Sequence, residues 1–433
     1  MRAGQILKVS VCAAKVFASE PSSWHPTVSG DHADEFAIGE QDIGEQVLGL
    51  APDSGLHTLK LSLPYNEEVN CMWSTNHTAQ YCACTHPEFD HGKGISILTT
   101  PARAEILFAT SLSTMKDDHT VRDPLFRTVF GLSGVAGHGR GLFATSHISA
   151  GSLITQEAPI MLVDHNFFRD VESEDAQLAL LLPALEKLPK TTRQTFEELH
   201  AGSKLSRDSR VSKTWTNSYS ISGGPRKDWP GLDSEDDPGM MAVHANISKI
   251  NHSCRSNVAS QWDWESLSHK TYALRDIAVD EELTMNYFDT RQTSKDRREY
   301  VENSLGFKCK CKLCKAENKT IDLSDDRINE IHLLESHLED LQIAPADPTG
   351  MAELLVSLYE QEGLHLYMSK AYALAALEWN GVGNEFQARS WAYKSVGAGL
   401  IVGETAGVED YVEDMQELLD GARTHWSWKH RVR

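Results

Sequence analysis

Three closely spaced cysteines have the residue type and the spacing of metal ligands. Cys309, Cys311 and Cys314 form a Cys-x-Cys-x-x-Cys pattern, with lysines at positions 308, 310 and 312 beside them. Zinc takes about four soft ligands in a tetrahedron, and positive neighbours stabilise the thiolate that binds it. The pattern therefore predicts a zinc site that lacks one ligand, for which Cys254 is the natural candidate. The alternative is a surface loop with three reduced, unbound cysteines.

The segments that must position these cysteines read as short strands and helices. Strands are predicted at 92–98, 126–130, 141–144 and 152–157, where short apolar runs lie between turn residues. Helices are predicted at 101–109, where Pro101 suits a first turn, over 174–205, and at 354–359, 367–379 and 385–399. This order is typical of small β-sheets followed by an antiparallel helical bundle.

The composition favours basic partners. The 433 residues include 41 Lys and Arg against 62 Asp and Glu, a formal net charge of −21. Such a protein repels polyanions, so we expect no direct binding to nucleic acid. No apolar run approaches the ~20 residues that span a bilayer, so we expect no membrane segment. We also expect the protein to be a monomer. Residues 321–433 hold 8 basic and 20 acidic residues, which either attract a basic peptide or only keep a helical surface solvated.

The chain has eight cysteines, too few in 433 residues for a disulfide scaffold. The first residues faintly resemble a secretory signal, but Lys8 and Lys15 interrupt the apolar stretch. An extracellular protein with disulfides among Cys71, Cys82 and Cys84 is therefore the less favoured interpretation. We expect the nucleus, the cytoplasm or both.

Four sequence blocks, taken in order, resemble the signature of SET-domain protein-lysine methyltransferases. They are Gly137-His138-Gly139-Arg140-Gly141-Leu142-Phe143-Ala144, Asn251-His252-Ser253-Cys254-Arg255-Ser256-Asn257, Glu281-Glu282-Leu283-Thr284-Met285-Asn286-Tyr287, and the cysteine run preceded by Arg297-Arg298. Each block is weak alone, but the four together are specific. The long insert before Asn251, the thiol in the second block and the helical C-terminal region resemble the SMYD-like class. A MYND zinc finger is missing, since residues 165–240 contain no cysteine.

The resemblance implies an α+β protein with a particular division of the chain. A SET fold of short β-sheets, with a knot-like threading of the Asn251 block, would occupy 121–290 and include a helical insert at 165–240. A zinc-bound post-SET element at 291–318 and a C-terminal α-helical region at 319–433 would follow. Residues 1–120 would form an N-terminal extension of unknown role.

The resemblance also implies S-adenosylmethionine as cofactor, a protein lysine as substrate, and roles for the block residues. Tyr287 would be the catalytic tyrosine, although it could instead be a core residue that ends a strand. Cofactor-binding roles are implied for His138, Gly139, Arg140, Gly141, Asn251, His252 and Phe307, and zinc-binding roles for Cys254, Cys309, Cys311 and Cys314. The glycines would let main-chain amides approach the cofactor, and Asn251 offers it both an acceptor and donors.

Four residues depart from the family pattern. Asp280 stands where a glycine is usual, Ser256 where a proline is usual, Leu305 where an aromatic residue is common, and His138 where the related class often has lysine. None of them removes a group that the chemistry requires. The leading hypothesis is therefore a protein-lysine N-methyltransferase acting on a histone tail or another basic protein. The alternative is a catalytically silent SET scaffold that binds partners through its acidic helical region.

Overall fold

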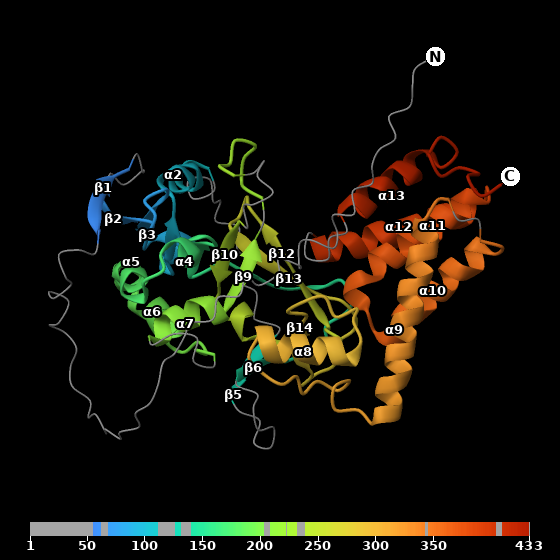
Figure 1. Ribbon diagram of the computed structural model, residues 1–433, viewed down its shortest axis with the longest axis horizontal. Helices are drawn as coiled ribbons and strands as arrows, with labels where there is room; N and C mark the ends of the chain where they lie inside the picture. The colour runs from blue at the N-terminus through green and yellow to red at the C-terminus, as the bar shows by residue number, and fades with distance from the viewer. Residues whose placement is uncertain are drawn as a thin grey trace, which may run out of the picture. The chain divides into compact units, whose positions relative to one another are not determined.

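The computed structural model describes residues 55–61, 68–110, 126–130, 140–202, 208–221, 223–231, 239–342, 345–403 and 409–432 (Figure 1). Its strands are β1 (His57–Lys60), β2 (Glu68–Trp73), β3 (Gln80–His86), β4 (Ile95–Thr99), β5 (Phe126–Phe130), β6 (Arg140–Ala144), β7 (Leu153–Glu157), β8 (Met161–Asp164), β9 (Ser218–Ile221), β10 (Met240–Val243), β11 (Asn251–His252), β12 (Val258–Asp263), β13 (Ser268–Ala273) and β14 (Glu282–Met285).

The helices lie between these strands in the chain and follow the last of them. They are α1 (Phe89–Gly92), α2 (Pro101–Ala109), α4 (Phe167–Asp170), α5 (Glu174–Glu186), α6 (Lys190–Glu197), α7 (Ser209–Thr216), α8 (Ser294–Ser304), α9 (Asn318–Glu339), α10 (Pro348–Glu362), α11 (Met368–Gly381), α12 (Glu385–Val402) and α13 (Glu409–Gly421), with 3₁₀ turns η1 (Ile247–Lys249) and η2 (His365–Tyr367). Within the described residues, no helix is both long and apolar enough to cross a membrane.

The largest sheet joins strands from two parts of the chain that the sequence analysis assigned separately. Its order is β1-β2-β3-β4-β8-β10-β9, so strands before residue 100 share a sheet with strands of the 165–240 insert and its flanks. The link is the parallel pairing of β4 with β8, which places Ile97 beside Leu162. Because strand residues alternate between faces, one face packs on α5 and α6 and the other on α2.

A disulfide crosses the N-terminal part of this sheet. Cys71 on β2 lies opposite Cys82 on β3, and the two residues form the bridge. Cys84, two residues further along β3, is a buried free thiol. This pair is the one observation in the described residues that matches the less favoured extracellular interpretation.

Two smaller sheets carry the signature blocks. Their orders are β11-β14-β6-β5 and β12-β13-β7, and the strands predicted at 126–130, 141–144 and 152–157 are confirmed as β5, β6 and β7. Apolar side chains from both sheets, among them Leu142, Val258 and Leu283, form one buried cluster. The observed architecture is therefore mixed α and β, with short strands in the signature-bearing part.

Asp280 shows why a glycine is usual at its position. It lies in the turn before β14 with φ of 64°, in the left-handed region that costs most side chains energy. Aspartate is among the few residues that visit this region, because its short polar side chain can hydrogen-bond locally. The backbone N–H of Asp280 donates to the carbonyl of Ala144 at 2.9 Å, so the departure from glycine leaves the turn and its pairing in place.

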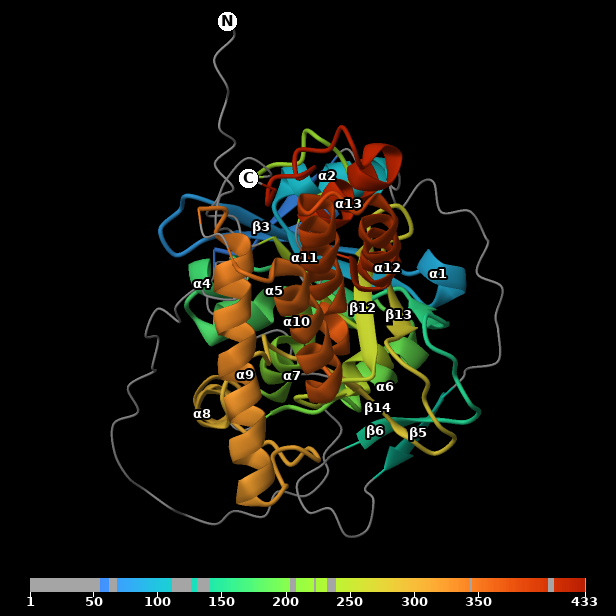
Figure 2. The same ribbon diagram turned by 90° about the vertical axis from the view of Figure 1, so that its right-hand side faces the viewer.

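The C-terminal region is a series of packed helices, as the sequence predicted. Figure 2 shows α9, α10 and α11 side by side, and each of α10, α11, α12 and α13 packs against the helix before it. Asp347 caps the start of α10 through the backbone N–H of Gly350, and Gly363 ends that helix with φ of 64°. Small residues such as Ala373, Ala376 and Ala392 form part of the core between the last helices.

One buried carboxylate fastens this helical region to the signature blocks. Glu362, the last residue of α10, is 5% exposed. It accepts hydrogen bonds from Arg255 of the second block, from Ser324 at 2.6 Å and from Arg327 at 2.7 Å, both on α9. Since Arg255 follows Cys254 directly, this cluster holds the candidate metal ligand against the helices.

We predict that Glu362→Ala lowers the free energy of unfolding by about 3–5 kcal/mol, because it leaves the charge of the largely buried Arg255 without its carboxylate partner. Glu360→Ala, an exposed carboxylate on the same helix, is the control and should change stability by less than about 0.5 kcal/mol. Urea unfolding of both variants measures the difference. Equal effects would contradict the role of the cluster.

The same carboxylate gives the interaction a pH dependence. Burial raises the pKa of Glu362, but hydrogen bonds from Ser324 and Arg255 outweigh it, so the pKa lies below the ordinary value of 4.5. A carboxylate with a lower pKa in the folded than in the unfolded state stabilises the fold above its unfolded pKa and loses this effect as the pH falls. The stability gap between wild type and Glu362→Ala should therefore shrink below about pH 4.5.

Candidate active site and metal centre

The second and third signature blocks meet along a short parallel pairing. Asn251 on β11 lies beside Thr284 on β14, and His252 lies beside Met285. The Nδ2 of Asn251 donates a hydrogen bond to Oε1 of Glu282 at 2.8 Å. Because these two side chains project from neighbouring strands, the pairing forms a small polar cluster at the start of β14.

Gly141 on β6 completes this cluster by having no side chain. A Cβ atom added there would lie 2.7 Å from Oε1 of Glu282 and 3.1 Å from Nδ2 of Asn251. Any other residue would therefore push against the pair. Gly141 is therefore the residue that lets β6 approach Asn251 and Glu282 this closely, and the amide and carboxylate gathered here are groups that can hydrogen-bond a small zwitterion.

The first block lies partly outside the described residues. His138 and Gly139 are among the residues that the structure does not describe. Arg140 opens β6, and its backbone pairs with Phe130 of β5. The contacts of His138, Gly139 and Arg140 with a cofactor therefore stay predictions.

Asn257, at the end of the second block, holds that block against β14. It is 1% exposed, and its Oδ1 accepts from the backbone N–H of Thr284 at 2.8 Å. Its Nδ2 donates to the carbonyl of Glu282 at 2.9 Å and to Oε1 of Glu281 at 3.1 Å. Asn257 and Glu282 both lie in the signature blocks, but no role for either residue was predicted from the sequence.

Tyr287 stands just beyond β14, at the edge of this cluster. Its hydroxyl donates a hydrogen bond to the carbonyl of Ile250 at 2.6 Å, and 38% of the residue is exposed. Removal of the hydroxyl from water, followed by the charge of Glu282, raises the pKa of Tyr287 above its ordinary value. The phenol is therefore neutral near pH 7 and can both donate and accept a hydrogen bond.

His252 packs between the aromatic residues of the site. Its ring stacks on Phe288 at 5.1 Å between centroids, and lies 5.3 Å from Tyr287 and 6.2 Å from Phe307. Burial is the main cause that lowers the pKa of His252 to about 4, so the ring is neutral. Its Nδ1 accepts from the backbone N–H of Tyr287 at 3.2 Å, which leaves the ring proton on Nε2, 3.6 Å from the sulfur of Cys254.

The turn after α8 brings Phe307 into this group. Gly306 has φ of 72°, and the backbone N–H of Phe307 donates to the carbonyl of Val301 at 3.3 Å, the pattern of a helix that ends in a left-handed glycine. The chain then reverses toward the second block. Phe307 remains 37% exposed, so one side of this aromatic group is open to solvent.

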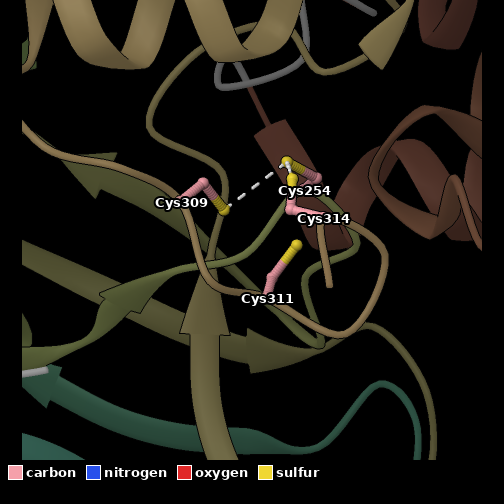
Figure 3. Close-up of side chains that lie close together, drawn as sticks. All are labelled: Cys254, Cys309, Cys311 and Cys314. Carbon is pink, nitrogen blue, oxygen red and sulfur yellow. Dashed lines mark hydrogen bonds between the residues drawn. The ribbon is translucent and has the colours of Figure 1, made fainter. Parts of the chain in front are cut away.

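The four cysteines meet in one cluster (Figure 3), and Cys254 is the member that lies beside His252. The sulfur of Cys254 lies 3.9 Å from that of Cys309 and 3.6 Å from that of Cys314, and all four sulfurs lie within 4.8 Å of one another. Tetrahedral zinc with Zn–S bonds of about 2.3 Å places its sulfurs about 3.8 Å apart. The cluster therefore has the donor atoms and the spacing for one tetrahedral ion.

The thiols of this cluster compete for ionisation. Hydrogen bonding from Cys254 is the first cause that lowers the pKa of Cys311 and of Cys314, the latter to about 7. Hydrogen bonding with Cys309 is the first cause that raises the pKa of Cys254. A thiolate that forms first accepts from its neighbours and makes them harder to ionise. A bound divalent cation removes this competition, since it replaces the protons on all four sulfurs.

Comparison with known proteins agrees with this geometry. The SET domain family model matches residues 139–288, which contain β6, β11, β14 and Tyr287. The chain therefore carries a SET domain and is related to the SET-domain lysine methyltransferases, as its signature blocks indicated.

Individual relatives match shorter stretches. Histone-lysine N-methyltransferase SMYD3 of Homo sapiens is 35% identical over 83 residues, which are 19% of this chain and 19% of SMYD3. Histone-lysine N-methyltransferase set5 of Schizosaccharomyces pombe is 32% identical over 74 residues, 17% of this chain and 23% of set5. The SET domain-containing protein L678 of Acanthamoeba polyphaga mimivirus is 28% identical over 198 residues, 42% of this chain and 75% of L678. The chain thus spans about a fifth of the first two relatives.

We predict that metal analysis of the purified chain finds about one zinc per molecule, because four sulfurs satisfy a closed tetrahedral site. Cys254→Ser should lose most of this metal, since it removes the ligand that joins the cysteine run to the second block. Cys84→Ser, a buried free thiol outside the cluster, is the control and should keep its zinc. A full complement of zinc in Cys254→Ser, or none in the wild type, would contradict the assignment.

Proposed function

We propose that this chain is an S-adenosylmethionine-dependent protein-lysine N-methyltransferase. The observation that carries the proposal is the position of Tyr287, whose hydroxyl is fixed by the Ile250 carbonyl beside the Asn251, Glu282 and Gly141 cluster. Support also comes from the SET match and from relatives that are named histone-lysine N-methyltransferases.

The cluster offers hydrogen-bond donors and acceptors of the kind that a zwitterionic cofactor needs. The methionyl end would lie near Gly141, with Asn251 as a hydrogen-bond partner. By the family resemblance, Gly139, Arg140 and His138 would also contact it. His252 and Phe307 would flank the adenosyl part. When bound, the cofactor supplies a methyl group on a positively charged sulfur.

The protein's own task is to align a neutral amine and to exclude water. A free lysine has a pKa of about 10.4, and the attacking amine must first lose its proton. An apolar channel near a positive charge lowers that pKa through desolvation and through repulsion between like charges. Tyr287 would orient the amine through its hydroxyl, and Phe307 would form one aromatic wall of the channel, where ring faces also favour a cation.

A bound zinc ion would also hold Phe307, the proposed aromatic wall of the lysine channel, in place. With Cys254, Cys309, Cys311 and Cys314 bound to one ion, the segment after α8 would be fixed over the second block. In this proposal the SET domain occupies 121–290, with a knot-like threading of the Asn251 block, and the zinc element occupies 291–318. The helical region 319–433 would follow as a separate acidic surface.

The substrate we propose is a basic protein such as a histone tail. Residues 321–433 have a net charge of −12, from 8 basic and 20 acidic residues, and a field of this sign speeds the approach of a basic partner. The names of SMYD3 and set5 point to histone lysines for those relatives.

We predict that Asn251→Ala weakens S-adenosylmethionine binding by about 1.5–3 kcal/mol, the range for losing a hydrogen bond to a charged group. Asn303→Ala, an exposed amide on α8, is the control and should bind as the wild type does. Calorimetric titration measures both variants. Unchanged affinity in Asn251→Ala would remove Asn251 from the cofactor site, and no binding by the wild type would leave the silent scaffold as the better account.

We predict that Tyr287→Phe cuts turnover at least about tenfold and leaves cofactor affinity nearly intact, because it removes the hydroxyl that aligns the amine but keeps the ring. Tyr300→Phe is a nearby control, since Tyr300 packs at 4.7 Å from Phe288 in the same aromatic group. Initial rates with labelled cofactor measure the difference. Full activity of Tyr287→Phe would show that the hydroxyl is dispensable.

A further inference from the structure

The segment that carries the cysteine run has a charge opposite to that of the whole chain. Residues 303–316 contain four lysines and no carboxylate, in a chain whose formal net charge is −21. The lysines are Lys308, Lys310, Lys312 and Lys315. We call residues 303–316 the lysine loop.

The lysine loop presents part of this charge to solvent. The sulfurs of Cys309 and Cys311 turn inward to the cluster, whereas Lys308, Lys312 and Lys315 are exposed. Lys308 lies 3.2 Å from Glu302, but the two side chains are 77% and 56% exposed. An ion pair this exposed is weak, so it leaves Lys308 able to exchange partners.

The metal site accounts for only part of the positive charge. Four thiolates around one divalent ion leave two negative charges, which is fewer than the four lysines of the lysine loop. The charges are also separated in space, because the sulfurs turn inward whereas Lys308, Lys312 and Lys315 are exposed, so the outer side of the loop presents lysine ammonium groups.

The lysine loop adjoins the exposed aromatic residues of the candidate site. Phe307 directly precedes Lys308. Phe307 and Tyr287 are 37% and 38% exposed, and both lie near the ring of His252. A protein segment that delivers a lysine to Tyr287 must pass this exposed aromatic group. Its neighbouring residues then meet the lysine loop at short range.

We propose that the lysine loop selects target lysines that have aspartate or glutamate beside them. The inference rests on the proposed methyltransferase function and adds a substrate feature to it. The acidic helices would steer a basic protein over long range, whereas the contact at the lysine loop would favour a carboxylate and disfavour an arginine. The substrate would therefore carry a basic stretch and, next to the target lysine, an acidic residue.

The test compares two synthetic peptides that each contain one lysine and differ only in its neighbours, Asp in one and Arg in the other. The full chain should have a lower KM for the Asp peptide, by about two- to fivefold for each exposed ion pair, with similar kcat. The double variant Lys308→Glu with Lys312→Glu should reverse the preference and keep its zinc. The control is the double variant Lys60→Glu with Lys227→Glu, which makes the same change in charge at exposed positions on β1 and after β9. It should keep the wild-type preference.

The direction of the change separates selection from a structural defect. A damaged loop would raise KM for both peptides, whereas charge selection raises it for one and lowers it for the other. Equal KM values in the wild type, or a loss of both activities together with zinc in the double variant and in Lys308→Ala, would overturn the proposal.

Binding of the same peptides, measured by fluorescence anisotropy with S-adenosylhomocysteine present, keeps this test separate from the proposed function. If neither peptide is methylated but the Asp peptide binds more tightly and the double variant reverses this, the methyltransferase proposal fails and the lysine loop stands. If both peptides are methylated and both bind equally well, the methyltransferase proposal stands and the lysine-loop proposal fails. Tighter binding should also weaken with added salt, since the contacts are exposed.

Discussion

A single buried imidazole connects the candidate catalytic residue with the cysteine cluster. His252 accepts a hydrogen bond from the backbone of Tyr287 on one side and places Nε2 3.6 Å from the sulfur of Cys254 on the other. Because the ring is neutral and packed on Phe288, it cannot move without disturbing both neighbours. The position of Tyr287 therefore depends on the geometry of Cys254, and through it on the run from Cys309 to Cys314.

The rest of the described chain supports this connection from two directions. Asn257 fastens the second block to β14 through hydrogen bonds to Thr284 and Glu282, and Tyr287 follows the end of that strand. Glu362 holds Arg255 from the helical side, so the residue after Cys254 is fixed by α9 and α10. The four cysteines, the helical region and Tyr287 are thereby connected through a few residues of one short block.

The sequence predicted the local elements well where one residue decides the structure. Pro101 begins α2 as expected, and the helices α10, α11 and α12 cover the predicted segments, because apolar spacing and turn residues mark them. The grouping of Cys254 with the cysteine run was expected because that run lacks a fourth ligand, and the family resemblance implied it as well. The structure brings the four sulfurs together. Zinc itself, and the roles of Asn251 and Tyr287, stay predictions.

Features that depend on partners distant in the sequence could not be predicted in this way. The pairing of β4 with β8 places Ser96 beside Met161, and no local pattern in either strand identifies the other strand as its partner. The same holds for Glu362, which reads as an ordinary charge at a helix end until Arg255 is placed beside it. Glu282 and Asn257 were visible in the signature blocks, but their roles follow only from the close approach of Gly141 and from the pairing of β11 with β14.

The central claim is that this site transfers a methyl group to a lysine side chain, and mass spectrometry tests it most directly. The full chain would be incubated with S-adenosylmethionine bearing a deuterated methyl group and with a library of lysine-containing peptides that includes histone tails. The account predicts deuterated methyl groups on lysine Nζ with the wild type and a strong reduction with Tyr287→Phe. Label on no lysine, from a chain shown to bind the cofactor and to hold its zinc, would contradict it.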